Sequence, residues 1–233
     1  MSTQSLDSLH HSFDDPVHGS QQVFRQLLKA MSEPGTVEEV TCMDIDSSLI
    51  DAGFYKTSYS VGLSLLDDQT PTALSPDLNQ VVIRNSLIFH CACPISAVSS
   101  SNSEKSTNEA QFLFLNASEW QGLSQNTALS LGDLSYPERS TTVVLQVDAI
   151  NSVFLDQENT QKLSLRGPGI ETTRDVYVAG LNDELITSIQ ENHNVFPLGY
   201  DFILAAPNAF LCLPRTCLVD IQSSSSTTVT KGA

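Results

Sequence analysis

Basic residues are scarce in this chain of 233 residues. Lysine and arginine together number 11 against 27 aspartates and glutamates, so the formal net charge is −16 at pH 7. Such a surface repels nucleic acid and anionic lipid at long range, and neither is an expected partner. An anionic ligand would have to be held by a local cluster of the few arginines. Hydrophobic residues make up 40% of the chain, enough for the core of one large α/β domain.

Long apolar segments are absent as well. No apolar run approaches the roughly 18 residues that a membrane-spanning helix requires. The first residues, "MSTQSLDSLHHSFDD", are polar and acidic and have neither the basic nor the apolar region of a signal peptide. We therefore expect a cytoplasmic protein with a single domain over 15–221 and two disordered tails, 1–14 and 222–233.

Cysteine is limited to five residues, an odd number in a chain without an export signal, which favours reduced thiols. They are Cys42, Cys91, Cys93, Cys212 and Cys217. The segment "HCAC", from His90 to Cys93, does not have the spaced ligand pairs of a structural zinc site. We expect buried thiols and no metal.

Common cofactor motifs are also missing. The chain has no P-loop, no G-x-G-x-x-G that opens a helix and no G-x-S-x-G elbow. A pyridoxal-phosphate (PLP) enzyme needs a lysine for its Schiff base. None of the five lysines follows a short strand that ends in a small residue: Lys29, Lys56, Lys105, Lys162 and Lys231. No cofactor is expected.

What the sequence does contain is a clear helical pattern. Val23, Phe24, Leu27, Leu28 and Met31 recur at helical spacing and predict a helix that Pro34-Gly35 ends. Further helices are predicted over 54–68, 75–90, 117–124 and 182–194. The third of these four is short. Ser-Pro-Asp opens the one at 75–90, and Asn182 caps the last.

Strand patterns alternate with these helices. Strands are predicted over 35–40, 70–74 and 110–116, and on both sides of a turn at Pro207-Asn208, with Pro214 ending the second of that pair. The segment 140–150 is β-branched and nearly continuous, so we expect it at the centre of a sheet. The serine-rich segment 96–109 is predicted to be a polar loop. The order of elements indicates one α/β domain with helices packed on a mixed sheet.

The segment "LRGPGIETTR", from Leu165 to Arg174, raises the question of a phosphate loop. Phosphate cradles need converging backbone N–H groups, usually at a helix N-terminus. Pro168 has no N–H, and alternating patterns on both sides predict a pair of antiparallel strands instead. The flanking Arg166 and Arg174 therefore remain the candidates for ligand binding in this segment.

Four other residues are candidates for ligand binding or for an interface. Arg215 follows Pro214 at a strand end, where ligands of α/β sheets often bind. Tyr136 lies in a turn before the central strand, His193 ends a helix, and Arg25 lies on the first helix. Each has a structural alternative, because a surface arginine pairs with carboxylates and a helix end favours histidine. No residue is singled out as catalytic.

Five segments occur in a recognisable order: "FRQLLKAMSEPG", "YPERSTTVVLQV", "LSLRGPGI", "NVFPLGYDFILAAP" and "LPRT". Together they make the chain resemble the PhnH subunit family of the bacterial carbon–phosphorus lyase system. The resemblance covers nearly all of the chain except the tails. "HCACP" departs from the family's usual "HTGCP" at Cys91 and Ala92.

The resemblance implies a three-layer α/β/α fold with a central mixed sheet, related to PLP-dependent transferases but without the cofactor site. It also implies a homodimer that joins PhnG, PhnI and PhnJ subunits. With an accessory ATP-binding-cassette subunit, that machinery transfers methylphosphonate onto the ribose of ATP and releases adenine. The product is α-D-ribose 1-methylphosphonate 5-triphosphate. The displacement of adenine is usually assigned to PhnI.

Three hypotheses follow. The first is an accessory subunit of the phosphonate complex with a structural or assembly role. The second is a subunit that binds a phosphorylated ligand in a cleft lined by Arg25, Arg166, Arg174 and Arg215. The third is an independent PLP-type transferase.

Overall fold

The computed structural model describes residues 11–98, 110–120 and 129–223. The helices in these parts are α1 (Pro16–Ser32), α2 (Ser47–Asp51), α3 (Lys56–Leu65), α4 (Val81–Cys91) and α6 (Asp183–Glu191). Three short 3-10 turns add η2 (Ala117–Glu119), η3 (Pro137–Arg139) and η4 (Asn192–Val195). Three predicted helices are confirmed: the one around Val23 as α1, the one over 54–68 as α3 and the one over 182–194 as α6. Most of the serine-rich loop, and the predicted short helix beyond residue 120, lie outside the described residues.

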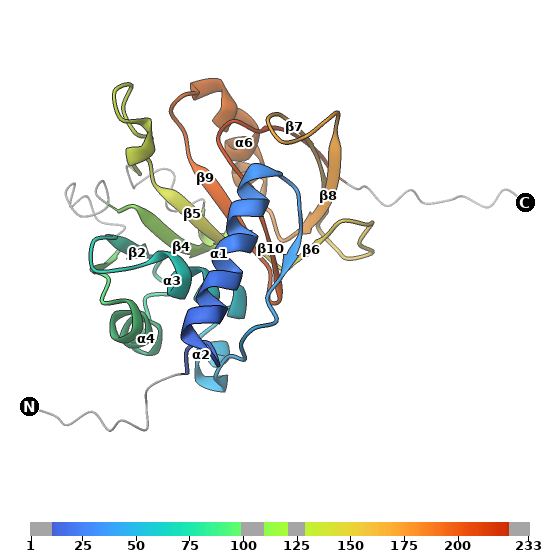
Figure 1. Cartoon of the computed structure of the whole chain (residues 1–233). Coiled ribbons are helices and arrows are strands. Elements are labelled where there is room, and N and C mark those ends of the chain that lie inside the picture. Colours follow the sequence, from blue (N-terminus) through green and yellow to red (C-terminus); the bar gives the residue numbers. More distant parts are fainter. Residues whose placement is uncertain (1–10, 99–109, 121–128, 224–233) are drawn as a thin grey trace, which may run out of the picture.

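The strands form two sheets (Figure 1). The larger, mixed sheet has the order β1-β10-β9-β5-β4-β2-β3. Its strands are β1 (Glu38–Glu39), β2 (Thr72–Leu74), β3 (Ile95–Ala97), β4 (Phe112–Asn116), β5 (Thr142–Gln146), β9 (Asp201–Ala205) and β10 (Ala209–Leu213). The smaller, antiparallel sheet has the order β11-β7-β8-β6. It contains β6 (Ala149–Asn151), β7 (Thr160–Arg166), β8 (Arg174–Ala179) and β11 (Leu218–Ser223).

The central position predicted for the segment after Ser140 is confirmed. Strand β5 is the fourth of seven strands and pairs in parallel with both β4 and β9. Its residues Val143, Val144 and Leu145 are all fully buried. Because successive side chains of a strand point to opposite faces, both faces of this sheet must be covered.

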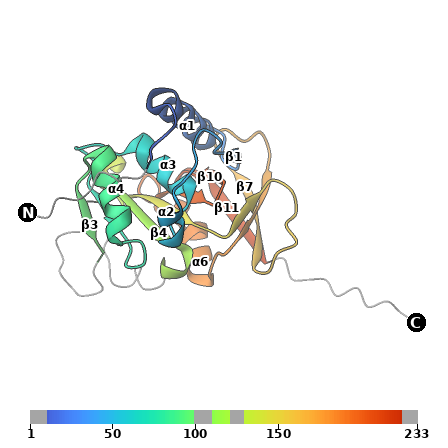
Figure 2. The ribbon, with the colours of Figure 1, turned by 90° about the horizontal axis from the view of Figure 1, so that it is seen from below.

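Two buried clusters cover the two faces. Val144 and its neighbours Phe114 and Ile203 pack under α1, α2, α3 and α4. Val143 and Leu145 belong to a second cluster, which also contains residues of α6 and of the smaller sheet. Figure 2 shows α1, α3 and α4 on one side of the large sheet and α6 on the other. The molecule is therefore an α/β protein with a large mixed sheet and helices on both of its sides.

The composition of the second outer layer differs from the expected helical layer. It consists of α6 together with the four-stranded sheet, whose Leu163, Leu165, Val176 and Val178 share the cluster below the large sheet. The antiparallel pair predicted around Gly-Pro-Gly is confirmed as β7 and β8, and it belongs to this smaller sheet. Strand alternation predicts that one face of such a pair is buried, but not which sheet the pair joins.

The caps explain where two helices begin. Asp15 accepts hydrogen bonds from the backbone N–H groups of Val17 and His18 at the start of α1, and Pro16 occupies the first position. The prediction for Asn182 is confirmed, since its Oδ1 accepts from the N–H of Leu185 at 2.8 Å. Asp183 and Glu184 follow in the first turn of α6, where negative charge complements the helix dipole.

The prediction that Ser75-Pro76-Asp77 opens a helix is wrong. These residues lead into a turn, and α4 begins six residues later at Val81. The reason is a competing acceptor: the carboxylate of Glu119 accepts the hydroxyl of Ser75 and the backbone N–H of Asp77. The Ser75 carbonyl accepts the N–H of Asn79 in a single turn, which does not continue into α4 because the backbone of Gln80 is extended.

The described fold extends slightly beyond the expected domain limits. Phe13 lies in the core at 5% exposure, two residues before the expected start at 15. It packs against α1 at Gly19, where an added Cβ would lie 2.6 Å from the Phe13 side chain. At the other end, β11 pairs with β7 as far as Ser223.

Candidate functional site

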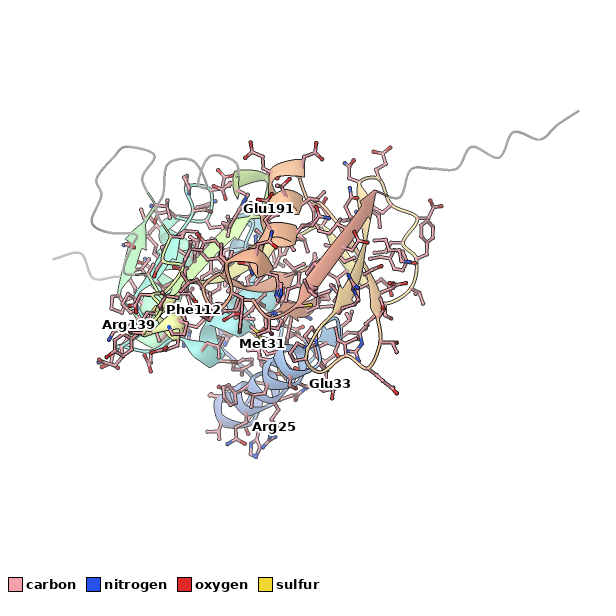
Figure 3. The ribbon with its side chains drawn as sticks, turned by 90° about the horizontal axis from the view of Figure 1, so that it is seen from above. Arg25, Met31, Glu33, Phe112, Arg139 and Glu191 are labelled. Atoms are coloured by element: carbon pink, nitrogen blue, oxygen red, sulfur yellow. The ribbon has the colours of Figure 1, made fainter. Side chains whose placement is uncertain are left out.

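The five segments that carry the resemblance converge on one edge of the large sheet. Strands β5 and β9 run parallel, and Thr142 and Asp201 lie opposite each other at their amino ends. Strand β10 runs antiparallel to β9, so its carboxyl end, followed by Pro214, reaches the same edge. Figure 3 looks onto the molecule from above and shows Met31 and Glu33 at the end of α1, with Arg139 at one side. We refer to this edge as the amino edge.

Arg215 lies at the centre of the amino edge. Its guanidinium pairs with the carboxylate of Asp201, through Nη2 to Oδ2 at 2.5 Å and through Nε to Oδ1 at 3.2 Å. Nη1 donates to the Pro137 carbonyl at 2.6 Å, and Nη2 also donates to the Ser140 hydroxyl. The Arg215 side chain is 13% exposed. Arg215 therefore connects three of the five family segments to one another through hydrogen bonds.

Arg174 holds a second junction. Its Nη1 donates to the carbonyls of Glu33 and Pro34, at 2.9 and 3.1 Å, and to the Thr36 hydroxyl at 2.8 Å. These acceptors belong to the turn that follows α1. Arg174 at the start of β8 therefore ties the small sheet to the end of the first helix.

The Gly-Pro-Gly turn packs against that same helix end. Gly169 has φ +81°, and an added Cβ would lie 1.8 Å from the carbonyl oxygen of Ser32. Gly167 has φ +142°, and its Cβ would lie 3.0 Å from the carbonyl oxygen of Thr216 in the turn after β10. Both glycines are required by backbone conformation and close packing. The turn is thus a junction of three segments.

Tyr136 and His193 lie in the surface loops of the amino edge. Tyr136 is exposed, and the guanidinium carbon of Arg139 lies 4.1 Å from the centre of its ring, a cation–π contact. His193, in η4, stacks on Phe196 with ring centres 6.1 Å apart. Within the described residues, Nδ1 of His193 is buried and has no hydrogen-bond partner.

Arg25 and Arg166 are exposed on different elements. Arg25 lies on the outer side of α1, where its Nη2 donates to Gln21 at 3.3 Å. Arg166 ends β7 opposite Leu218 of β11. The molecule has two clefts of note in its described parts, and none of the four arginines proposed for a ligand site lines either of them.

The first cleft lies at the opposite edge of the sheet, beside the carboxyl ends of β5 and β9, where α/β folds commonly bind ligands. It measures about 430 Å³. Its walls are Asp44, Ile45, Ile50, Phe54, Tyr55, Lys56, Pro207 and Asn208. Burial raises the pKa of Tyr55 above its usual 10.0. The sequence did not predict this cleft because its walls come from separate parts of the chain; the position of Asn208 just after β9 was the one available signal.

Gln146 organises the backbone next to this cleft. It ends β5, is almost fully buried, and donates from Nε2 to the Gly53 carbonyl and to Asn116 Oδ1, both at 2.8 Å. Its Oε1 accepts the N–H of Tyr55 at 2.8 Å. The side chain therefore connects two parallel strands to the start of α3.

The second cleft lies at the amino edge and measures about 260 Å³. It is formed by the end of α6, η4 and the segment before β5. Its walls are Trp120, Leu129, Leu131, Ser188, Glu191, Asn192, Val195 and Tyr200. Burial raises the pKa of Tyr200 above its usual 10.0.

All five thiols are free, and the expected burial is confirmed for Cys91, Cys93, Cys212 and Cys217, whereas Cys42 is partly exposed. Burial raises the pKa of Cys217 to about 11 and that of Cys212 further, so both remain protonated at pH 7. Across the described stretches, no three histidine, cysteine or acidic side chains are grouped to hold a metal ion. In those same stretches, no helix is long and apolar enough to cross a membrane.

Comparison with known proteins agrees with the family resemblance of these segments. Residues 11–220 match the family model described as the bacterial phosphonate metabolism protein PhnH. The chain is 32% identical over 206 residues to the "Alpha-D-ribose 1-methylphosphonate 5-triphosphate synthase subunit PhnH" of Rhizobium meliloti (strain 1021), covering 88% of this chain and 92% of the relative. It is 27% identical over 205 residues to the "Putative C-P lyase subunit protein HtxG" of Stutzerimonas stutzeri, covering 88% of this chain and 87% of the relative. The chain belongs to the PhnH family of bacterial phosphonate metabolism proteins.

Proposed function

We propose that this chain is a subunit of the carbon–phosphorus lyase core complex, which makes α-D-ribose 1-methylphosphonate 5-triphosphate from ATP and methylphosphonate. The proposal rests on the relative named as the PhnH subunit of α-D-ribose 1-methylphosphonate 5-triphosphate synthase. That relative is 32% identical, and the alignment covers 88% of this chain. Its partners are subunits of the PhnG, PhnI and PhnJ type, and its place is the cytoplasm.

Within the complex we assign it a structural or assembly role. The polar side chains of the family segments support this role, because they join backbone segments to one another. Arg174 binds two carbonyls and a hydroxyl, and Arg215 binds Asp201, a carbonyl and a hydroxyl. Donors used in this way hold a surface in a fixed shape, which is what a partner subunit needs to recognise.

Reconstitution tests the proposal. Subunits of the PhnG, PhnI and PhnJ type are produced with and without this chain, the chain carries an affinity tag, and ³¹P NMR follows methylphosphonate and ATP. We expect the tagged chain to retain the other subunits, and the ribose 1-methylphosphonate product to form only when it is present. Product formation at an unchanged rate without the chain, together with a tagged chain that purifies alone, would refute the proposal.

Two finer expectations stay predictions drawn from the resemblance. One is the homodimer, which light scattering of the isolated chain would detect as twice the mass of 25.3 kDa. The other is the relation of the α/β architecture to PLP-dependent transferases. A colourless protein without aldimine absorbance would count against a retained PLP chemistry.

Binding of a phosphorylated ligand is the second candidate function. Arg25 and Arg166 are the members of the proposed arginine set that lie exposed. Calorimetry with ATP decides between the two roles. Heat of binding that disappears in Arg166→Ala would favour the ligand-binding role, whereas no heat would leave the assembly role.

A further inference from the structure

Two loops of the amino edge together expose several large apolar side chains. One loop precedes β5 and the other includes the end of η4. Their exposed members, which we call the two-loop surface, are Leu131 (37%), Leu134 (78%), Tyr136 (48%), Val195 (43%) and Phe196 (54%). Exposed apolar patches that include aromatic residues are typical of protein interaction sites.

The two loops form one surface because they are bonded to each other and to the sheet. The N–H of Gly199 donates to the carbonyl of Leu131 at 3.1 Å. Arg215 holds the first loop in place through a hydrogen bond from Nη1 to the Pro137 carbonyl. Asn192 fixes the second, with its side chain bonded to both the N–H and the carbonyl of Tyr200 at 2.9 and 2.8 Å. A surface fixed in this way loses little entropy when a partner binds.

The cleft of about 260 Å³ opens within this surface, since Leu131 and Val195 both line it. Small-molecule sites usually measure about 300–1,000 Å³, so this one is better matched to one or two side chains of a protein. Its floor is aromatic and preorganised. Trp120 donates from Nε1 to the Ser188 hydroxyl at 2.9 Å and packs edge-on against Tyr200 with ring centres 6.2 Å apart.

The charged residues around the two-loop surface indicate which charges a binding partner carries. Asp133, Glu138 and Glu191 are exposed carboxylates of these loops and of the cleft wall. Arg139 is the basic residue of the first loop and lies over the Tyr136 ring. The rim is therefore acidic, like the chain as a whole with its net charge of −16. Complementarity then requires lysine or arginine on the partner.

We propose that the two-loop surface docks another subunit of the phosphonate complex, which inserts an apolar side chain into the cleft beside Trp120 and places basic residues against Asp133, Glu138 and Glu191. The inference rests on the proposed function, because it names the face through which the subunit assembles. Tyr136 and Arg139 of this surface are of the residue types that dominate binding energy at interfaces.

The test uses two substitutions at exposed positions, Leu134→Lys and Phe196→Ala, in the tagged full-length chain. Neither side chain belongs to the buried core. Affinity for the co-produced subunits is measured by calorimetry, and we expect each substitution to weaken it by about tenfold. The matched control is Val81→Lys on α4, which changes an equally exposed residue (72%) on a different face and should leave the affinity unchanged.

A charge reversal provides an independent readout. Glu191→Lys should weaken binding and also reduce its dependence on salt, because one attractive charge pair is lost. Mass by light scattering shows whether the isolated chain is a dimer. If Leu134→Lys turns a dimer into a monomer, the surface binds a second copy and the proposal is overturned.

The outcomes separate this inference from the proposed function. If the unaltered chain retains no other subunit, the proposed function fails and the docking surface with it. If the unaltered chain binds and Leu134→Lys, Phe196→Ala and Glu191→Lys bind equally well, only the docking surface fails. Loss of binding in these variants, with Val81→Lys retained, supports both.

Discussion

Ala92 occupies a backbone conformation that normally selects glycine. It follows the last residue of α4 with φ 55°, in the left-handed region, and its N–H bonds the Ile88 carbonyl. Left-handed conformation disfavours residues that carry a Cβ by about 1–2 kcal/mol. The family's usual "HTGCP" has glycine at this position. We predict that Ala92→Gly raises the free energy of unfolding by about 1 kcal/mol, measured by urea denaturation of the isolated chain.

Gly53 offers the reverse substitution as a control. It follows α2 with φ +76°, and nothing lies within 4 Å of an added Cβ. Gly53→Ala should therefore lower the free energy of unfolding through backbone conformation alone, by about 1 kcal/mol. Equal stability of Ala92→Gly and the unaltered chain, with Gly53→Ala destabilised, would show that the end of α4 adapts to alanine.

Two arginines that look alike in the sequence should differ in their effect on stability. Arg174→Met leaves two carbonyls and a hydroxyl without their charged donor, which costs about 2 kcal/mol. Arg25→Met removes one long hydrogen bond at an exposed position and should change stability by less than about 0.5 kcal/mol. Thermal unfolding of both variants measures the contrast. Equal melting temperatures would contradict the structural role of Arg174.

The sequence identified these arginines as special but could not assign their partners. Arg174 meets Glu33 from 141 residues away, and Arg215 meets Pro137 from 78 residues away. Spacing along the chain carries information about neighbours within a few turns of a helix or along one strand. Contacts over such separations are set by how whole elements pack. The absence of a P-loop and the presence of proline at 168 were enough to favour a turn between strands over a phosphate cradle.

At the scale of elements, one cross-strand contact makes the small sheet sensitive to pH. Hydrogen bonds from Lys162 and then from the Ser164 hydroxyl hold the pKa of Asp175 below its usual 3.8. A lowered folded-state pKa contributes stability above the unfolded value, and this contribution is lost as the pH falls through the folded value.

We therefore predict that Asp175→Asn lowers the melting temperature above pH 4 by at most about 3 °C, because both side chains of the pair are partly exposed and solvent weakens their interaction. The difference between the variant and the unaltered chain should shrink as the pH falls below 3.8. Scanning calorimetry from pH 3 to pH 7 measures both chains. A difference that stays constant over this range would show that the carboxylate charge of Asp175 contributes nothing.

Element types were largely predictable, and their association into sheets was not. The apolar run of β5 indicates burial on both faces, and the caps of α1 and α6 follow from single side chains. The switch from the large sheet to the small one occurs between Gln146 and Ala149, inside what reads as one strand. A close approach between Gly180 and Asp148 accompanies it, since a Cβ on Gly180 would lie 2.8 Å from that side chain. The local sequence pattern does not indicate this switch from one sheet to the other.

At the scale of the whole molecule, the two edges of the large sheet differ in character. The amino edge is fastened by Arg174, Arg215 and close-packed glycines, and it carries the two-loop surface. The carboxyl edge has the larger cleft, with Lys56 in its wall. The segments that identify the family thus mark a structural junction, and their presence alone could not have located either cleft.

Charge is also a property of the whole molecule. The chain has 27 acidic and 11 basic side chains. In the described parts, lysine and arginine form three ion pairs with carboxylates: Lys29–Glu38, Lys162–Asp175 and Arg215–Asp201. The chain keeps a large acidic excess, and repulsion among its carboxylates disfavours the compact state.

We predict that sodium chloride acts on this protein with opposite signs in two measurements. Raising the salt from 0.01 to 0.15 M shortens the screening length from about 30 Å to about 8 Å, which weakens repulsion within the chain. The melting temperature of the isolated chain should therefore rise. The affinity for the other subunits should fall over the same range, because salt also screens the acidic rim from basic partner residues. If salt instead strengthens the complex, burial of apolar surface dominates docking and the acidic rim is not what the partner recognises.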